Sequence, residues 1–469
     1  MGFNSLHFIF FLTIVFTVHW LLPHRWRWMF LLVASYYFYM SWNAWFGILL
    51  FGTTLIDWKC ALEMEKTAVR SKRRVWLMFS LISNLGCLAA FKYSAFLYNT
   101  LEWTRAEIAN DIPHYMQAIL IPVGLSFYVF HSLSYTIDVY RGKINAEKNF
   151  GIFALFVSFF PQLVAGPIAR FDQLGVQFHE QKFLRSELLI TGARLAIWGY
   201  FKKIAIADRL ADFVNPIFDS PGSYDGLTLL IGGFFFVVQV YCDFSGYSDI
   251  ATGIARMFGY ELTLNWRRPL LSRSLHEFWQ RNHISMTRWF RDYVYISLGG
   301  SRVKFPRMLL NLFLVFLISG LWHGAQWTFV LWGAMHGVMY ILEILLKGKL
   351  RIRFLGWPYL ILFHTITLIA FRANSFSDLG IFYSKIFSFD WHLSTAYTDL
   401  RTMNDLISFV LAISGILFLF VKELSEERAW FVRLPRFENT WRPVFYTMLF
   451  VAIFVIGQFS ANEFIYFHF

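Results

Sequence analysis

The chain has 469 residues, of which 57% are hydrophobic and 20% aromatic, and its mean hydropathy is +0.48. This composition is too apolar for a soluble domain and is typical of a protein that crosses a membrane many times. The formal net charge of +12 comes from lysines and arginines in short connectors beside apolar runs, a pattern that favours membrane orientation over nucleic-acid binding.

The first apolar run, 6–22, has no basic residue before it and no small-residue cleavage site after it, so we interpret it as a retained span. Several of the predicted spans are short or interrupted. All the predicted spans together cover 6–22, 28–41, 44–62, 75–98, 115–138, 187–212, 227–259, 308–321, 325–346, 354–371, 404–421 and 443–460. The corners at Trp42 and Trp322 indicate helical hairpins or half-helices inside a bundle. Without a repeat or a soluble region, the chain is expected to form one membrane domain, 1–469.

Charge in the connectors predicts the orientation of the spans. Basic connectors at 66–74, 141–143, 267–268, 302–304 and 347–353 are expected to face the cytoplasm. Less basic connectors at 107–111, 219–225 and 378–399 fit the outer side, as do both termini.

Polar residues interrupt two apolar segments. Asp243, Ser245 and Asp249 lie within the span 227–259, where the carboxylates need partners; the candidates are the arginines at 256, 267, 268 and 288. Structural ion pairing is favoured over catalysis for these acids. The segment 160–170 carries two prolines and a glycine in an apolar context, and is either a re-entrant loop or a kinked connector.

The region 265–336 packs charge most tightly between apolar runs. If 275–293 is helical, one stripe is polar, with His276, Gln280, His283, Thr287 and Arg291, and another stripe is apolar and includes Trp279. Such a helix either lies in the membrane interface or lines a wet cavity.

His323 lies between two apolar runs, in the sequence Gly-Leu-Trp-His-Gly-Ala over 320–325. An ionisable group at that depth is costly and suggests function, and an imidazole can exchange protons with a hydroxyl at neutral pH. A histidine that only bonds neighbouring helices is the structural alternative.

Familiar site motifs are absent from the sequence. It has no P-loop, dinucleotide fingerprint, G-x-S-x-G elbow or H-E-x-x-H pair. Its three cysteines show no C-x-x-C spacing, so neither a disulfide framework nor a metal site is predicted. The residues alone therefore fit either an enzyme or a transporter with a histidine-centred cavity.

Several motifs together resemble the membrane-bound O-acyltransferases, most closely the bacterial branch of alginate O-acetyltransferases and D-alanyl-teichoic-acid acyltransferases. They span nearly the whole chain, with the core at about 120–340, and they lie at 122–128, 160–170, 243–249, 277–300, 320–325, 371–374 and the Phe-Ile-Tyr-Phe ending. The resemblance implies an all-α polytopic fold, a ring of about 11–13 transmembrane or re-entrant helices around a central tunnel. One departure is Asn282, where that branch usually has tryptophan.

The resemblance also implies catalytic roles for two histidines. His323 is the essential histidine of the family, expected to act as a general base, and His283 is the second, expected to orient the hydroxyl or stabilise the oxyanion together with Arg291 or Asn282. A covalent acyl-histidine relay is an alternative. Trp279, Trp322, Asp243 and Ser245 are expected to line the tunnel or bind substrate.

By this resemblance the reaction moves an acetyl group from a cytoplasmic thioester, acetyl-CoA or an acyl carrier protein, toward an exported or cell-wall polysaccharide such as alginate, cellulose or peptidoglycan. Basic residues over 267–307 suit the donor phosphates or ordinary membrane anchoring. No permanently bound cofactor or metal is expected. The expected location is the bacterial inner membrane, and the expected partners are an extracytoplasmic SGNH-type acetyltransferase and the polysaccharide synthesis and export machinery.

Three other functions remain open at this point. The first is D-alanyl transfer to teichoic acid from a dedicated carrier protein. The second is proton-coupled transport with His283, His323 and Asp243 as a relay. The third is a non-catalytic subunit of an export complex.

Overall fold

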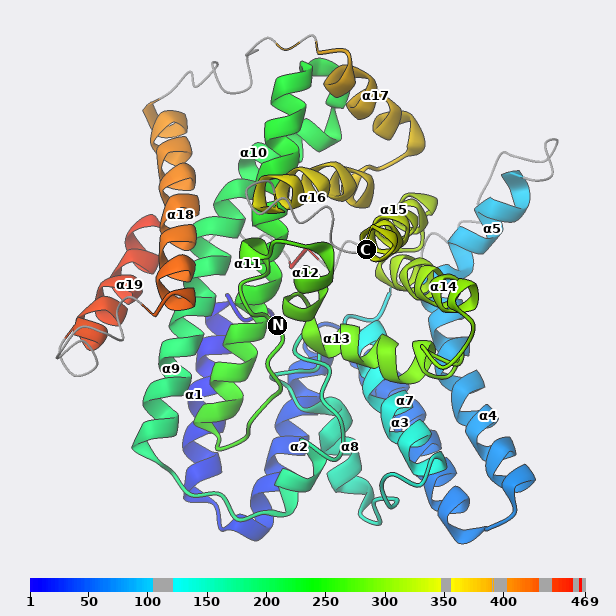
Figure 1. The fold of residues 1–469 in the computed structure, drawn as a ribbon. Coiled ribbons are helices and arrows are strands. Elements are labelled where there is room, and N and C mark those ends of the chain that lie inside the picture. Colours follow the sequence, from blue (N-terminus) through cyan, green and yellow to red (C-terminus); the bar gives the residue numbers. More distant parts are fainter. Residues whose placement is uncertain are drawn as a thin grey trace. The chain divides into compact units, whose positions relative to one another are not determined.

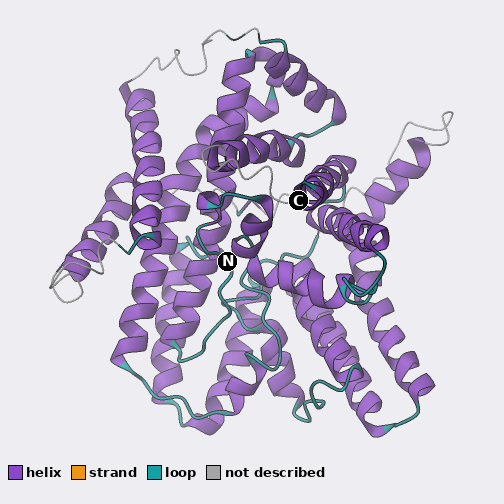
Figure 2. Cartoon of the chain, in the orientation of Figure 1, coloured by secondary structure: helices purple, strands orange, loops and turns teal. Residues whose placement is uncertain are grey.

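The computed structural model describes residues 1–103, 121–346, 356–389, 391, 403–429, 441–458 and 464–465. Every regular element within these ranges is a helix, which confirms the predicted all-α class (Figure 2). The chain divides into two compact units, Met1–Ala193 with Ala251–Thr263 and Arg194–Ile250 with Leu264–Phe469. Two helices, α9 (Ser186–Tyr200) and α11 (Gly226–Met257), contribute to both units. The expectation of a single membrane domain stays a prediction.

Six helices in the described part of the chain are long and apolar enough to cross a membrane. They are Ala44–Lys66, Arg70–Tyr98, Gly226–Met257, Phe305–His323, Trp327–Leu345 and Leu406–Glu427, with shorter apolar helices at Leu6–Leu21 and Arg442–Ile456. All eight coincide with predicted spans, so the protein is a multi-pass membrane protein. Part of the predicted span 115–138 lies outside the described residues, and the helix there begins at Leu125.

The first unit is built from α1–α5 and two later helices (Figure 1). Its helices are α1 (Leu6–Leu21), α2 (His24–Met40), α3 (Ala44–Lys66), α4 (Arg70–Leu88), α5 (Ser94–Trp103), α7 (Leu125–Tyr140) and α8 (Phe150–Ser158). Buried Asp57 on α3 accepts hydrogen bonds from Ser80 and Asn84 on α4 at 2.6 and 2.8 Å, and these bonds join the two helices through buried polar groups.

The segment 160–170 follows α8 as irregular backbone. Residues 159–169 are all buried within the first unit, and the Phe160 amide donates to Ser35 Oγ at 3.1 Å. Irregular backbone of this kind is tolerated in a membrane protein only where protein satisfies it.

The second unit carries the polar segment 265–336. Its helices are α10 (Asp208–Asp219), α12 (Leu275–Arg281), α13 (Ile284–Trp289), α14 (Phe305–His323), α15 (Trp327–Leu345), α16 (Gly356–Arg372), α17 (Phe376–Phe387), α18 (Met403–Glu427) and α19 (Arg442–Ile456). Wide π-helical turns follow α9 at Phe201–Ala207 and α13 at Phe290–Tyr295. Such turns are frequent at functional sites because they change which side chains face inward.

The hairpin of α14 and α15 places His323 at its corner. A Cβ on Gly320 would meet the Phe329 carbonyl oxygen and would lie 3.3 Å from Gly333 Cα, so the two backbones touch at these glycines. Small residues allow such close crossing of membrane helices. The corner predicted at Trp322 is therefore a tight hairpin, in which glycines of both helices allow the two backbones to touch.

Candidate active site

The segment 275–293 is not one helix, so the single polar stripe predicted from its sequence is wrong. Helix α12 ends at Arg281, and α13 begins at Ile284. Asn282 has an extended backbone and His283 a left-handed one, with φ +43°. Because of this break, the His283 side chain does not lie on the same face as the other residues of the predicted stripe. The other four members of the stripe share a different cavity, described below.

His283 is held by Asn265, a residue that the sequence analysis did not single out. Asn265 Oδ1 lies 3.2 Å from His283 Nδ1 and accepts from Ser285 Oγ at 2.8 Å, while Asn265 Nδ2 donates to Ser248 Oγ at 3.2 Å. Because this amide oxygen can only accept, His283 Nδ1 carries the proton and Nε2 is the basic nitrogen. Burial lowers the pKa of His283 to about 3, so its imidazole is neutral at physiological pH.

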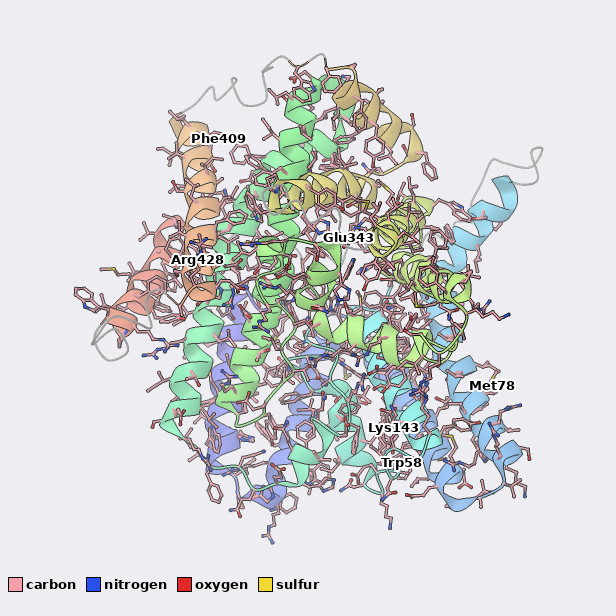
Figure 3. All side chains as sticks on the ribbon, in the orientation of Figure 1. Trp58, Met78, Lys143, Glu343, Phe409 and Arg428 are labelled. Carbon is pink, nitrogen blue, oxygen red and sulfur yellow. The ribbon has the colours of Figure 1, made fainter. Side chains whose placement is uncertain are left out.

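The N-terminus of α12, one helix length before this bend, is fixed by a carboxylate from α15. Glu343, labelled in Figure 3, accepts from the backbone amides of Leu275 and His276 at 2.8 and 3.2 Å. A carboxylate at this position satisfies amides that a helix N-terminus leaves unpaired and complements the helix dipole.

His323 is the last residue of α14 and is 4% exposed. Its ring packs edge-on against Trp322, Trp332 and Phe371, with centroids 4.9, 5.2 and 5.5 Å away. His323 and His283 line the same cavity, which has a volume of about 60 Å³. The two histidines predicted from the sequence are thus brought together; their catalytic roles stay predictions.

The walls of this histidine cavity are almost entirely apolar and aromatic. Its lining residues are Val237, Val240, Tyr241, Phe244, Trp266, Leu270, Phe278, Trp279, Asn282, His283, Met286, His323, Trp332, His336, His364, Leu368 and Phe371. The sequence analysis did not identify His336 or His364 as site residues. No group of histidine, cysteine or acidic residues able to hold a metal ion occurs among the described residues.

Two of the tryptophans that line this cavity carry unpaired hydrogen-bond donors. The Nε1 atoms of Trp279 and Trp332 are buried and have no hydrogen-bond partner among the described residues. An indole N–H can only donate, and leaving it unpaired in an apolar wall is costly. Each of these groups would gain a hydrogen bond from an acceptor atom that reached it.

A larger cavity of about 610 Å³ lies behind Trp279 and Met286, which line both spaces. We call it the basic chamber, because Arg288 and Arg291 are its charged lining residues. His276, Gln280 and Thr287 also line it. Arg291 is paired with Asp292 at 2.7 Å and lies in this chamber rather than beside His283.

A third cavity of about 370 Å³ shares Phe371 with the histidine cavity. We call it the polar chamber. Its lining includes Asp243, which is paired with Lys203 at 2.6 Å. Asp249 is paired with Lys202 at 2.7 Å. Structural ion pairing of these acids was predicted correctly, but the partners are lysines of the π-helical turn and not the arginines that the sequence suggested.

The remaining predicted lining residues do not face these three cavities. Ser245 is buried and accepts a hydrogen bond from Lys202 Nζ at 2.8 Å. Trp322 is buried behind the histidines, with its ring centroid 6.2 Å from that of His283. Asp243 lines the polar chamber and not the histidine cavity.

The part of the chain that forms this site matches known proteins. The model of the membrane-bound O-acyltransferase family matches residues 147–377, which include α12, the bend at His283 and His323. The probable alginate O-acetylase of Azotobacter vinelandii is 37% identical over 436 residues, covering 91% of this chain and 87% of the relative.

Two other relatives are named for substrates other than alginate. The peptidoglycan O-acetyltransferase of Helicobacter pylori is 34% identical over 347 residues, covering 68% of this chain and 64% of the relative. The teichoic acid D-alanyltransferase of Streptococcus thermophilus is 26% identical over 245 residues, covering 48% of this chain and 58% of the relative.

Proposed function

The chain belongs to the membrane-bound O-acyltransferase family and is an O-acyltransferase; from this premise we propose that it passes an acetyl group across the membrane toward an exported polysaccharide. One observation supports this proposal above all. Two histidines line a small apolar cavity that shares wall residues with a basic chamber on one side and a polar chamber on another. This arrangement suits two substrates that approach separately and meet at one point.

The basic chamber is the proposed donor site. Arg288 and Arg291 line it, and it lies close in sequence to the connector 302–304, whose charge predicts a cytoplasmic location. Guanidinium groups suit the phosphates of coenzyme A or of a carrier-bound phosphopantetheine arm. The thioester would then reach the histidine cavity past Trp279 and Met286.

In the proposed reaction, an acceptor hydroxyl attacks the thioester carbonyl. His323 takes the hydroxyl proton as the new C–O bond forms, and it returns that proton to the sulfur as the C–S bond breaks. His283, neutral and with Nε2 basic, accepts a hydrogen bond from a second hydroxyl of the acceptor and so orients the reacting one toward His323. Transfer neither consumes nor releases a net proton.

Oxyanion stabilisation falls to donors in the cavity wall. The expected participation of Arg291 does not fit, because Arg291 faces the basic chamber. The indole N–H groups of Trp279 and Trp332 are donors without partners, and the Asn282 amide lines the same cavity. Preorganised donors of this kind stabilise developing charge best where water is excluded.

The size and polarity of the histidine cavity favour acetyl over D-alanyl transfer. Its volume of about 60 Å³ is below the roughly 150 Å³ of a known apolar cavity that binds benzene. A D-alanyl group carries an ammonium, whose burial among aromatic rings without a carboxylate would be costly.

The relatives named for alginate and peptidoglycan O-acetylation support an exported or cell-wall polysaccharide as the final acceptor. The proposed setting is the bacterial inner membrane, beside polysaccharide synthesis and export machinery. An extracytoplasmic SGNH-type acetyltransferase would complete the transfer to the polymer.

The proposal is tested in cells that carry the gene with His323→Ala. Polysaccharide is isolated, and ester-bound acetate is released with mild base and measured against total polymer. We expect normal polymer yield and ester content at background. Unchanged ester content in a strain with both His323→Ala and His283→Ala would instead support a non-catalytic subunit and overturn the proposal.

A further inference from the structure

The first unit carries a dense group of basic side chains where α4 begins. Four of the first five residues of α4 are cationic: Arg70, Lys72, Arg73 and Arg74. All but Arg73 are exposed, and none of the four pairs with a carboxylate among the residues that the structure describes. We call these four residues the α4 basic cluster. It belongs to the connector whose charge predicts a cytoplasmic location.

Tyr140, the last residue of α7, gathers the arginines of this cluster. Arg70 and Arg74 donate hydrogen bonds to the Tyr140 hydroxyl, and these bonds lower the pKa of the phenol. Arg73 donates to the backbone carbonyls of Val139 and Tyr140 at 2.9 and 2.8 Å. Arg73 is therefore engaged by the end of α7, whereas Arg70 and Arg74 converge on one phenol oxygen at the surface.

This convergence is electrostatically unfavourable unless an anion is present. Arg70 and Arg74 are four residues apart on one helix, a spacing at which like charges repel. They also lie at the positive end of the helix dipole, and the first turn of α4 contains no acidic residue. The neutral phenol accepts hydrogen bonds but brings no full negative charge. An anion would compensate both guanidinium groups, each of which has further N–H donors to offer.

The surface of α4 beyond the cluster is apolar and faces outward. The candidate span Arg70–Tyr98 has only 22% of its most apolar stretch buried inside the protein. Met78, labelled in Figure 3, and Ile82 continue the four-residue spacing of Arg70 and Arg74, and they are 46% and 63% exposed. An apolar chain can therefore lie along the same stripe of α4 that begins with the two arginines. A free phosphate ion would gain nothing from this stripe.

We propose that Arg70 and Arg74, held together by Tyr140, bind the phosphate of an anionic phospholipid whose acyl chains lie along Met78 and Ile82. Guanidinium groups match the geometry of phosphate oxygens, and the phenol fixes the two groups before the lipid arrives. An anionic headgroup is favoured, because a zwitterionic one brings its own cation to a cluster that is already positive. This site lies in the first unit and does not depend on the proposed acetyl transfer.

Lipid binding to the purified full-length protein tests the inference directly. Delipidated protein in detergent is titrated with dioleoylphosphatidylglycerol or dioleoylphosphatidylcholine, and bound lipids are counted by native mass spectrometry. We expect the first phosphatidylglycerol to bind at least about tenfold more tightly than the first phosphatidylcholine. Arg70→Gln combined with Arg74→Gln should weaken phosphatidylglycerol binding about 10- to 30-fold and remove this preference. Tyr140→Phe keeps both charges but releases them, so a loss of about three- to fivefold is expected.

A matched control removes the same charge elsewhere in the first unit. Arg25→Gln combined with Arg185→Gln alters two other exposed arginines and should leave the first phosphatidylglycerol bound as tightly as before. Equal losses in the two double variants would show that net charge attracts the lipid, and would overturn the inference. Displacement of the lipid by excess inorganic phosphate would also overturn it, as would unchanged lipid binding by Arg70→Gln with Arg74→Gln together with lost binding of an acidic carrier protein.

Thermal unfolding in nanodiscs gives a second readout. In phosphatidylcholine alone, the Arg70→Gln and Arg74→Gln protein should unfold at the same temperature as the parent or a higher one, because a repulsive pair is gone. Added phosphatidylglycerol should raise the unfolding temperature of the parent and not that of the variant. A variant that is already destabilised in phosphatidylcholine would show that the two arginines support the fold itself, and would contradict the proposed lipid site.

Discussion

The indole N–H of Trp332 can be removed with little change in the shape of the histidine cavity. Trp332→Phe keeps an aromatic ring beside His323 and removes the proposed oxyanion donor. We expect kcat to fall about 10- to 100-fold with a smaller change in KM. Trp198→Phe, which alters a buried tryptophan that does not line the histidine cavity, is the control and should change neither parameter. Equal losses in both variants would contradict the assignment.

The neutral state of His283 has a measurable pH signature. Burial lowers its pKa to about 3, whereas an unfolded histidine titrates near 6.5. Between these values the unfolded chain binds a proton that the folded chain does not, so stability falls as pH drops below about 6.5. The loss is about 2 kcal/mol at pH 5.

We expect His283→Gln to remove that part of the acid sensitivity, measured as the change in melting temperature between pH 7.5 and pH 5. The acid limb of its activity profile should stay in place, because His283 does not titrate in that range. A shifted acid limb would show that His283 is the titrating group.

Sequence reasoning identified His323 because it is an ionisable residue between two apolar runs, and it identified His283 through a predicted polar stripe and the family resemblance. It missed Asn265, His336 and His364, whose roles depend on which side chains share a cavity. The left-handed backbone of His283 explains the failure of the predicted stripe, since helical periodicity assumes a continuous helix. No sequence pattern marked a non-glycine residue for that conformation.

The elements α12 and α13 form the wall between the basic chamber and the histidine cavity, through Trp279 and Met286. Met286→Ala is expected to enlarge the small cavity and to raise the ratio of butyryl to acetyl transfer at least tenfold, since one methylene is worth about 1–3 kcal/mol in a closed pocket. The measurement compares kcat/KM for the two thioesters. Met308→Ala, which alters only the basic chamber, should leave that ratio unchanged.

The crossing of α14 and α15 sets the position of His323. Gly320→Ala would push the new methyl into the Phe329 carbonyl, and we expect a loss of stability of about 1–3 kcal/mol with reduced activity. Gly380→Ala on α17 meets open space and should stabilise the protein by up to about 1 kcal/mol. Thermal unfolding of both variants checks the difference; a neutral Gly320→Ala would show that the hairpin can relax.

At the level of elements, hydropathy located the long spans well, because each is a continuous apolar run of sufficient length. It did not distinguish α8 or α17, which are short helices of 9 and 12 residues. It also merged α9, the π-helical turn and α10 into one span, since hydropathy does not report helical pitch.

At the scale of the whole molecule, the described part of the second unit includes cavities of about 610, 60 and 370 Å³, and the smallest shares wall residues with each of the other two. The smallest contains the histidines, and the larger two differ in charge. The resemblance predicted the family and its chemistry, but the volumes and the distinct chemistry of the chambers follow only from the folded chain.

The most direct test follows the acyl group itself. Proteoliposomes containing the purified protein receive a thioester labelled separately in its acetyl group and in its carrier, with a hydroxyl acceptor trapped inside. We predict that acetyl label becomes ester-bound inside while carrier label stays outside, and that His323→Ala abolishes this separation. Entry of both labels together, or undiminished acetyl transfer by His323→Ala, would contradict the account.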